Sequence, residues 1–236
     1  MNTDSEVQRL VEVYRQYGAS ELYRAKWDER NAGNAVILGE RLRGLREILQ
    51  RHGFLAASSC RVLDIGCGSG KLLADFVCWG VRPQNLYGLD LLEDRIQAAR
   101  ARLPDARLLT GNAESLPFDT GFFDLVCLFT VFSSILDHRM AQNVAGEAAR
   151  VLRPGGAVVW YDFRWNNPRN PNVRGMSRDE ITELFPGFVA HLQSITVFPP
   201  LARRLGRLTS VLYPVLASLP LFRTHYLGLL IKPPSE

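Results

Sequence analysis

The sequence predicts an α/β protein with a mostly parallel sheet and helices on both faces. From residue 61 onward, short runs of apolar and β-branched residues alternate with helical segments, as in βαβ units. The first run leads directly into a glycine-rich turn. Ahead of it, residues 5–52 carry apolar residues at spacings of three and four, which indicates helices. With 236 residues, 47% of them apolar, the chain can bury a sizeable core.

Seven runs along the chain have strand character. In chain order they are RVLDIG, LYGLDL, ARLLTG, DLVCLFT, GAVVWYDF, FVAHLQSITVF and HYLGLLIKP. Helices are expected at KLLADFVCWG, EDRIQAARARL and RDEITELFPG. We divide the chain into a helical cap (1–56), an α/β core (57–198), a basic lid insertion (199–222) and a final strand with tail (223–236).

The positive charge is concentrated near the C-terminal end. Between Leu184 and Ser235 there is no Asp or Glu, while Arg203, Arg204, Arg207, Arg223 and Lys232 supply five positive charges. In 199–222, helical spacing places apolar residues on one stripe, opposite Arg203 and Arg207: Leu201, Leu205, Leu208, Leu212, Val215, Leu216 and Leu219. Pro214 is expected to kink this helix. A basic amphipathic helix suits a membrane surface or a lipid-linked acceptor; the alternative is a lid that folds onto its own domain.

The cysteines, the first twenty residues and the length of the apolar stretches indicate the cellular compartment. The four cysteines show neither C-x-x-C spacing nor a histidine at metal-ligand spacing, which argues against a zinc site or disulfide framework. The first twenty residues alternate charged and apolar types, so we expect no signal peptide. No stretch reaches about 18 uninterrupted apolar residues, the length of a spanning helix. We expect a cytoplasmic protein, with peripheral contact at the inner membrane surface as an option.

The stretch RVLDIGCGSG indicates a small-molecule site. Gly66, Gly68 and Gly70 give the spacing G-x-G-x-G, and Lys71 stands where a dinucleotide-binding loop has its third glycine. The loop therefore favours a different adenine-containing ligand. Asp90 ends the next strand, where a carboxylate accepts hydrogen bonds from both ribose hydroxyls. The ligand that needs this combination is S-adenosylmethionine.

At these residues the sequence resembles the class I S-adenosylmethionine-dependent methyltransferases, most closely their small type 11 branch. The resemblance covers roughly residues 58–165. It rests on four stretches in the right order: VLDIGCGSG, LYGLDLLEDRI, GNAESLPFDTGFFDLV and EAARVLRPGGAVVW. It implies a Rossmann-like fold with a mostly parallel, seven-stranded sheet and helical cap elements.

The resemblance also implies roles for individual residues. Gly66, Cys67 and Gly68 would pass along the methionine and ribose, Asp90 would bind the ribose, and Leu91 would cover the adenine. Asn112 and Ala113 would read the adenine edge, where the family usually has Asp; the Asn112 amide oxygen is still an acceptor. Phe129 would offer its carbonyl to the methionine ammonium. Asp64 either takes part in the site or orients the loop.

The acceptor is expected at the carboxyl ends of strands four and five, in FTVFSSILDH and WYDFRWNNPRN. Asp162 and His138 are candidate general bases. The polar residues expected to face the acceptor are Tyr161, Arg164, Asn166 and Asn167, joined by Tyr23 and Trp27 of the cap. Alternatively, Asp162 caps a turn, the two asparagines shape a loop, and Tyr23 and Trp27 pack against the core. No metal site is expected, because strand four ends without a carboxylate.

These features predict an enzyme that O-methylates a small molecule, a sugar or a glycoconjugate, with a lipid-linked acceptor among the options. One alternative is an NAD-type oxidoreductase, disfavoured by Lys71. Another is a non-catalytic cofactor-binding protein that uses its basic helix for interaction. Nucleic acid is not expected as a partner, since only one segment is basic. The sequence does not indicate the oligomeric state.

Overall fold

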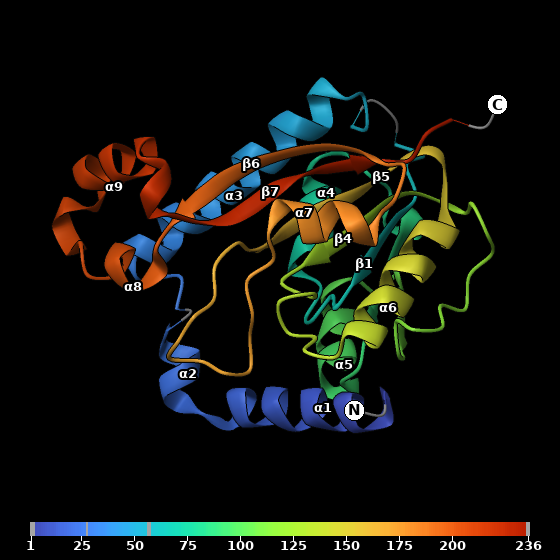
Figure 1. Cartoon of the computed structure of the whole chain (residues 1–236), viewed down its shortest axis with the longest axis horizontal. Coiled ribbons are helices and arrows are strands. Elements are labelled where there is room, and N and C mark those ends of the chain that lie inside the picture. The colour runs from blue at the N-terminus through green and yellow to red at the C-terminus, as the bar shows by residue number, and fades with distance from the viewer. Residues whose placement is uncertain (1–2, 27, 56–57, 235–236) are drawn as a thin grey trace.

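The computed structural model describes residues 3–26, 28–55 and 58–234 (Figure 1). Its α-helices are α1 (Thr3–Ala19), α2 (Glu21–Lys26), α3 (Ala32–Arg51), α4 (Lys71–Cys78), α5 (Glu93–Arg102), α6 (His138–Val151), α7 (Arg178–Leu184), α8 (Pro199–Ala202) and α9 (Thr209–Ser218). Its strands are β1 (Val62–Ile65), β2 (Leu86–Asp90), β3 (Arg107–Thr110), β4 (Phe123–Phe129), β5 (Leu152–Phe163), β6 (Val189–Val197) and β7 (Arg223–Ile231). Three short 3-10 turns are η1 (Pro83–Asn85), η2 (Gly206–Leu208) and η3 (Pro220–Phe222).

The strands form one seven-stranded sheet in the order β3-β2-β1-β4-β5-β7-β6. Strands β1 to β5 pair in parallel, and β7 pairs antiparallel with both β5 and β6. After β1, the chain adds β2 and then β3 on one side of β1. It then returns to the other side of β1, where it adds β4 and then β5. This reversal between β1 and β4 is where open α/β sheets bind ligands, outside the carboxyl ends of the strands.

Helices cover both faces of the sheet, as predicted (Figure 1). One apolar cluster packs α3, α4 and α5 against the sheet through residues such as Leu45, Leu73 and Ile96. A second cluster packs α6 and α7 on the opposite face through Val144 and Ile181, among others, and Leu10 joins α1 to it. The apolar, fully buried β1 is typical of a strand covered on both faces.

The segment between β6 and β7 projects from one end of the molecule (Figure 1). The prediction of one amphipathic helix over 201–219 is wrong: α8 ends at Ala202, and Gly206, at a φ of 52°, separates it from α9. The predicted stripe is also divided between two environments. Leu201, Leu205 and Leu216 pack toward Tyr213 and α3, whereas other members face solvent, namely Leu208, Leu212, Val215 and Leu219.

The projecting segment is fixed to the N-terminal end of α3. Asn31 caps α3 by accepting from the N–H groups of Gly33 and Asn34, and its amide donates to the Arg203 carbonyl at 3.2 Å. A side chain at Gly33 would meet the Ala202 carbonyl oxygen at 2.2 Å, so glycine permits this close approach. Within the described ranges, no helix is both long and apolar enough to cross a membrane.

Candidate functional site

A glycine-rich loop joins β1 to α4 and turns at the end of β2. Gly66, Gly68 and Gly70 have φ angles of 73°, 52° and 72°, in the left-handed region that favours glycine. The N–H groups of Gly66 and Cys67 donate to the Leu89 carbonyl at 2.7 and 3.1 Å. The loop backbone is thereby held at the carboxyl edge of the sheet.

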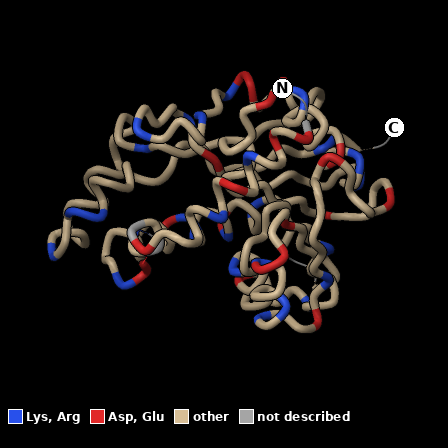
Figure 2. The backbone as a smooth tube through the Cα atoms, turned by 90° about the horizontal axis from the view of Figure 1, so that it is seen from below, with Lys and Arg blue, Asp and Glu red and all other residues tan. Residues whose placement is uncertain are grey.

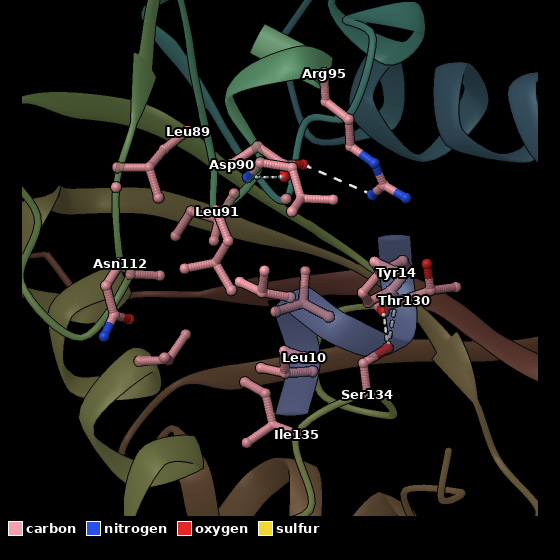
Figure 3. A pocket seen from close by; sticks show the side chains of 18 of the residues that line it. Leu10, Tyr14, Leu89, Asp90, Leu91, Arg95, Asn112, Thr130, Ser134 and Ile135 are labelled. Atoms are coloured by element: carbon pink, nitrogen blue, oxygen red, sulfur yellow. Dashed lines mark hydrogen bonds and ion pairs between the residues drawn. The ribbon is translucent and has the colours of Figure 1, made fainter. Parts of the chain in front are cut away.

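A cavity lies between this loop, the ends of β1 to β4 and helix α1 (Figure 3). Six of the predicted cofactor residues line it: Gly66, Asp90, Leu91, Asn112, Ala113 and Phe129. On the α1 side it is bordered by Leu10, Val11 and Tyr14. Residues chosen from motifs far apart in the sequence therefore meet at one cavity.

Asp90 is buried at the rim of this cavity and is already oriented by the backbone. Its Oδ2 accepts from the Gly68 N–H at 2.9 Å, and its Oδ1 accepts from the Leu92 N–H at 3.0 Å. The Arg95 guanidinium lies 4.0 Å from Oδ2. Each carboxylate oxygen retains a further lone pair, so the residue can accept two hydroxyl donors without losing its backbone bonds.

The other side of the cavity suits a flat ring with a polar edge. Leu91 and Ala113 supply apolar surface, and Asn112 lies at the same side of the cavity. The Asn112 Oδ1 accepts from the Glu114 N–H at 3.0 Å, and its amide donates to the Glu114 carboxylate at 3.0 Å. One lone pair of the amide oxygen remains for an exocyclic amine.

Three predicted cofactor residues stand behind the cavity surface. Cys67 is buried against Gly88, where a Cβ would come within 2.8 Å of its sulphur, so its side chain packs in the core. Gly68 contributes the N–H that orients Asp90. Asp64 is buried in β1, and burial, followed by the charge of Asp90, raises its pKa to about 8, while Arg41 opposes this rise.

Arg41 is a charged residue whose influence on Asp64 the sequence motifs did not reveal. Among the described residues, neither the Asp64 Oδ1 nor the Arg41 Nε has a hydrogen-bond partner, although both atoms are buried. The Arg41 guanidinium lies 5.6 Å from the Phe129 ring centre and 5.2 Å from that of Tyr161. A buried polar atom without a hydrogen-bond partner is costly. An ammonium group of a ligand would complement the Asp64 carboxylate, and a carboxylate group would complement the Arg41 guanidinium.

Thr130 follows β4 in an unfavourable backbone conformation. Its φ is 55°, which is rare for a β-branched residue. Its N–H donates to the Tyr161 carbonyl at 2.7 Å, and its hydroxyl donates to the Phe129 carbonyl at 2.7 Å. Residues held in such conformations concentrate at functional sites, and Thr130 lines the cavity.

The two predicted bases do not line the cavity. Asp162 is fully buried; its Oδ2 accepts from the Ser133 N–H at 2.9 Å, and its Oδ1 accepts from the Phe163 N–H at 2.8 Å. Burial raises its pKa to about 6, against the hydrogen bonds from Ser133. His138 is exposed at the start of α6, in a depression shared with Arg174 and Glu183. This geometry favours Asp162 as the residue that holds the loop after β4.

The predicted acceptor residues are dispersed. Tyr161 is buried on the α3 face, where it stacks on His225 at 4.8 Å and bonds to Thr196. The Arg164 guanidinium lies 5.1 Å from the ring centres of Trp165 and Tyr226.

The two asparagines shape their own loop. Asn166 accepts from the Gly175 N–H, and Asn167 accepts from the Arg169 N–H. In the cap, Tyr23 stacks on Tyr17 at 4.0 Å. Trp27 lies outside the described residues. No group of metal-ligating side chains occurs among the residues that the structure describes.

Sequence reasoning missed the contribution of α1 and of Arg95, and in the loop after β4, where the acceptor was expected, it singled out neither Thr130 nor Ser134. Tyr14, Arg95, Thr130 and Ser134 all line the cavity. Leu10 and Tyr14 are four residues apart and so share one helical face, a signal that was available in the sequence. Arg41, one of several arginines in α3, carried no comparable signal.

The strand order, the glycine loop and the acidic end of β2 are similar to those of class I, S-adenosylmethionine-dependent methyltransferases. Residues 62–156 match the family described as "Methyltransferase domain". The predicted methyltransferase class is thereby confirmed for this part of the chain.

Sequence relatives support the same class. A phthiotriol/phenolphthiotriol dimycocerosates methyltransferase of Mycobacterium tuberculosis is 38% identical over 109 residues, which are 45% of this chain and 39% of the relative. The Mycobacterium leprae protein of that name is 31% identical over 147 residues, 58% of this chain and 53% of the relative. The chain thus spans about half, or less, of the length of these relatives.

Solved structures share the fold. A methyltransferase from Archaeoglobus fulgidus has a TM-score of 0.61 at 15% identity, covering 90% of this chain and all of that one (100%). One from Methanosarcina mazei has a TM-score of 0.57 at 17% identity, covering 79% and 98%. At these identities, the likeness concerns the fold.

Proposed function

We propose that this protein transfers a methyl group from S-adenosylmethionine to a hydroxyl group of a small molecule, a sugar or a glycoconjugate. The observation that carries the proposal is the cavity at the reversal between β1 and β4, where Asp90 and Asn112 stand among apolar side chains. Bound there, the cofactor supplies an activated methyl group on a sulphonium. The protein's task is then to hold that group and an acceptor oxygen in line.

Each end of the cofactor has a matching part of the site. The Asp90 carboxylate accepts from the ribose hydroxyls, and Asn112 meets the adenine edge between Leu91 and Ala113. We place the charged methionyl end toward Asp64 and Arg41, which stand behind the cavity surface and each have a buried polar atom without a hydrogen-bond partner among the described residues. Because Asp64 and the Arg41 Nε are buried, their interactions with opposite charges are stronger than in water.

The acceptor that we favour is lipid-linked. The mycobacterial relatives are named for phthiotriol and phenolphthiotriol dimycocerosates, in which "triol" denotes hydroxyl groups. The end of the cavity near β4 is bordered by Val131 and Ile135 in addition to hydroxyl side chains. An apolar surface of this kind accommodates an alkyl chain next to a reacting hydroxyl.

The projecting segment supports peripheral membrane contact. Seven large apolar side chains are exposed there or beside it: Phe198, Leu208, Val211, Leu212, Val215, Leu219 and Leu221. Arg204 and Arg207 are exposed near them, and Figure 2 shows no acidic residue on this projection. Apolar side chains with neighbouring arginines suit an anionic bilayer surface, such as the inner face of a cytoplasmic membrane. Such contact would bring the enzyme to a lipid-linked acceptor.

A methyl-transfer assay tests the proposal. The full chain is incubated with S-adenosylmethionine labelled on its methyl carbon and with hexadecane-1,2-diol in dodecylphosphocholine micelles. We expect label in the organic-soluble fraction as a methyl ether, together with release of S-adenosylhomocysteine. If S-adenosylhomocysteine binds but no ether forms with any long-chain alcohol or glycolipid, the acceptor class is wrong.

A further inference from the structure

Helix α1 is held over the cavity by contacts with the loop that follows β4. The Glu6 carboxylate accepts from the Leu136 N–H at 2.7 Å, and the Arg9 guanidinium donates to the Ser134 carbonyl at 2.6 Å. Tyr14 and Ser134 are joined by a hydroxyl–hydroxyl bond of 2.7 Å (Figure 3). These contacts place the Tyr14 hydroxyl beside Thr130, at the end of β4.

The direction of the Tyr14–Ser134 bond follows from the neighbouring bond. The Ser134 hydroxyl donates to the Thr130 carbonyl at 3.1 Å. A hydroxyl carries a single hydrogen, so Ser134 cannot also donate to Tyr14, and Tyr14 must donate to Ser134. The chain of bonds therefore runs from Tyr14 through Ser134 to the carbonyl. Tyr14 has then used its hydrogen but keeps its oxygen lone pairs.

Nothing in the described part of the chain donates to the Tyr14 oxygen. The Arg95 guanidinium lies over the ring, 4.6 Å from its centre, and no hydrogen bond joins it to the Tyr14 oxygen. Among the described residues that line the cavity, the one carboxylate is Asp90, whose place is at the ribose end, and there is no histidine. The open acceptor on Tyr14 is therefore the group at the β4 end best suited to receive an O–H.

Building on the proposed function, we propose that Tyr14 binds the hydroxyl group that receives the methyl group, and that Ser134 positions Tyr14 for this task. The acceptor O–H donates to the Tyr14 oxygen, which turns a lone pair of the acceptor oxygen toward the methyl carbon. The site then requires a nucleophile that bears a hydrogen, such as an alcohol or an amine.

The reaction balances without a charged base. The acceptor oxygen forms a bond to the methyl carbon, and the carbon–sulphur bond breaks with its electron pair left on sulphur. The acceptor oxygen becomes acidic as the bond forms, and its proton passes to bulk water. Tyr14 contributes orientation through its hydrogen bond, and it remains neutral throughout.

Three variants test this role. Tyr14→Phe removes the acceptor atom, Ser134→Ala removes the partner that orients it, and Ser134→Thr keeps a hydroxyl. Tyr17→Phe is the matched control, because Tyr17 is in the same helix and its hydroxyl bonds to Asn170 at 3.2 Å, outside the cavity. All are assayed for methyl transfer to hexadecane-1,2-diol in micelles and for S-adenosylhomocysteine affinity by calorimetry.

We expect Tyr14→Phe to lower kcat by about 10²-fold, within the range for loss of a group that orients the reacting atoms. Ser134→Ala should lower it by about tenfold and Ser134→Thr by less, because threonine restores the hydrogen-bond partner. The affinity for S-adenosylhomocysteine should stay within threefold of wild type in every variant. A Tyr14→Phe enzyme with the turnover of Tyr17→Phe would overturn the proposal and leave the proposed function standing.

A structure of the S-adenosylhomocysteine complex decides the question without an acceptor. We expect the Tyr14 oxygen to face open space beyond the sulphur and to accept from an ordered water that stands in for the acceptor hydroxyl. If the Tyr14 oxygen instead bonds to the ribose or the adenine, Tyr14 is a cofactor ligand and the proposal fails. If the wild-type protein binds no S-adenosylhomocysteine, the proposed function itself fails.

Discussion

At the scale of the residue, Asp64 ties cofactor binding to pH. Burial and the charge of Asp90 raise its pKa to about 8, so the apo protein holds this carboxyl largely protonated at pH 7. A bound ammonium favours the carboxylate and lowers the pKa, so binding releases a proton. The affinity for S-adenosylhomocysteine should rise from pH 6 to pH 8 by at most about tenfold per pH unit. Calorimetry across this range measures the slope.

Asp64→Asn is the control for that prediction, because it keeps the shape and removes the titration. We expect the variant to bind more weakly and with a flatter pH dependence. An unchanged slope in Asp64→Asn would assign the proton to another group and separate Asp64 from the methionyl site.

Asp162 gives a second prediction at this scale. In Asp162→Asn, the amide nitrogen must face one of the two N–H groups that the carboxylate now accepts from, at Ser133 and Phe163. Leaving a buried donor unsatisfied costs about 1–3 kcal/mol, so the melting temperature should fall. Thermal unfolding and the methyl-transfer rate are measured together. A variant with wild-type stability and a rate about 10²–10⁴ lower would instead support a general base.

At the scale of the element, the sequence predicted the core better than the projection. Strand positions followed from apolar runs and glycine turns, because a buried parallel strand leaves a clear pattern. The break between α8 and α9 could not be predicted from spacing. It depends on Gly206 and on contacts with Gly33 and Asn34, which lie far away in the sequence. Likewise, periodicity does not show which leucines face Tyr213.

We predict that the projecting segment binds anionic membranes. Arg203 is not substituted in the test of this prediction, because its guanidinium donates to Asn34 at 3.1 Å and helps to fix the segment. Exposed Arg204 and Arg207 should each contribute about 1 kcal/mol of attraction to anionic lipid. Sedimentation with phosphatidylglycerol vesicles at low salt should therefore be weakened by Arg204→Ser with Arg207→Ser, by Val211→Asp, and by added salt.

The matched control is Val189→Asp, at the start of β6. Val189 is 56% exposed, against 66% for Val211, but it lies at the end of the strand remote from the projection. It should leave vesicle binding unchanged. A wild-type protein that ignores anionic vesicles at low salt would show that the exposed leucines and valines serve another purpose.

At the scale of the whole molecule, the ribose and adenine side of the site could be predicted, and the acceptor side could not. Asp90, Leu91 and Asn112 lie at or just after the ends of strands that meet at one edge of the sheet, so their places follow from the order of the strands along the chain. Tyr14 and Arg41 reach the site from helices that precede the sheet. The spacing of Leu10 and Tyr14 shows that they share a face of α1, but it does not show where α1 and α3 pack on the sheet.

The central claim is that this cavity binds S-adenosylmethionine through Asp90. Calorimetry with S-adenosylhomocysteine and with NAD, on the wild type and on Asp90→Ala, tests it most directly, with thermal unfolding as a check on folding. We predict that the wild type prefers S-adenosylhomocysteine and that Asp90→Ala binds it roughly ten- to hundredfold more weakly, a loss of about 1.5–3 kcal/mol. Equal binding by a folded Asp90→Ala protein, or a preference for NAD, would contradict the account.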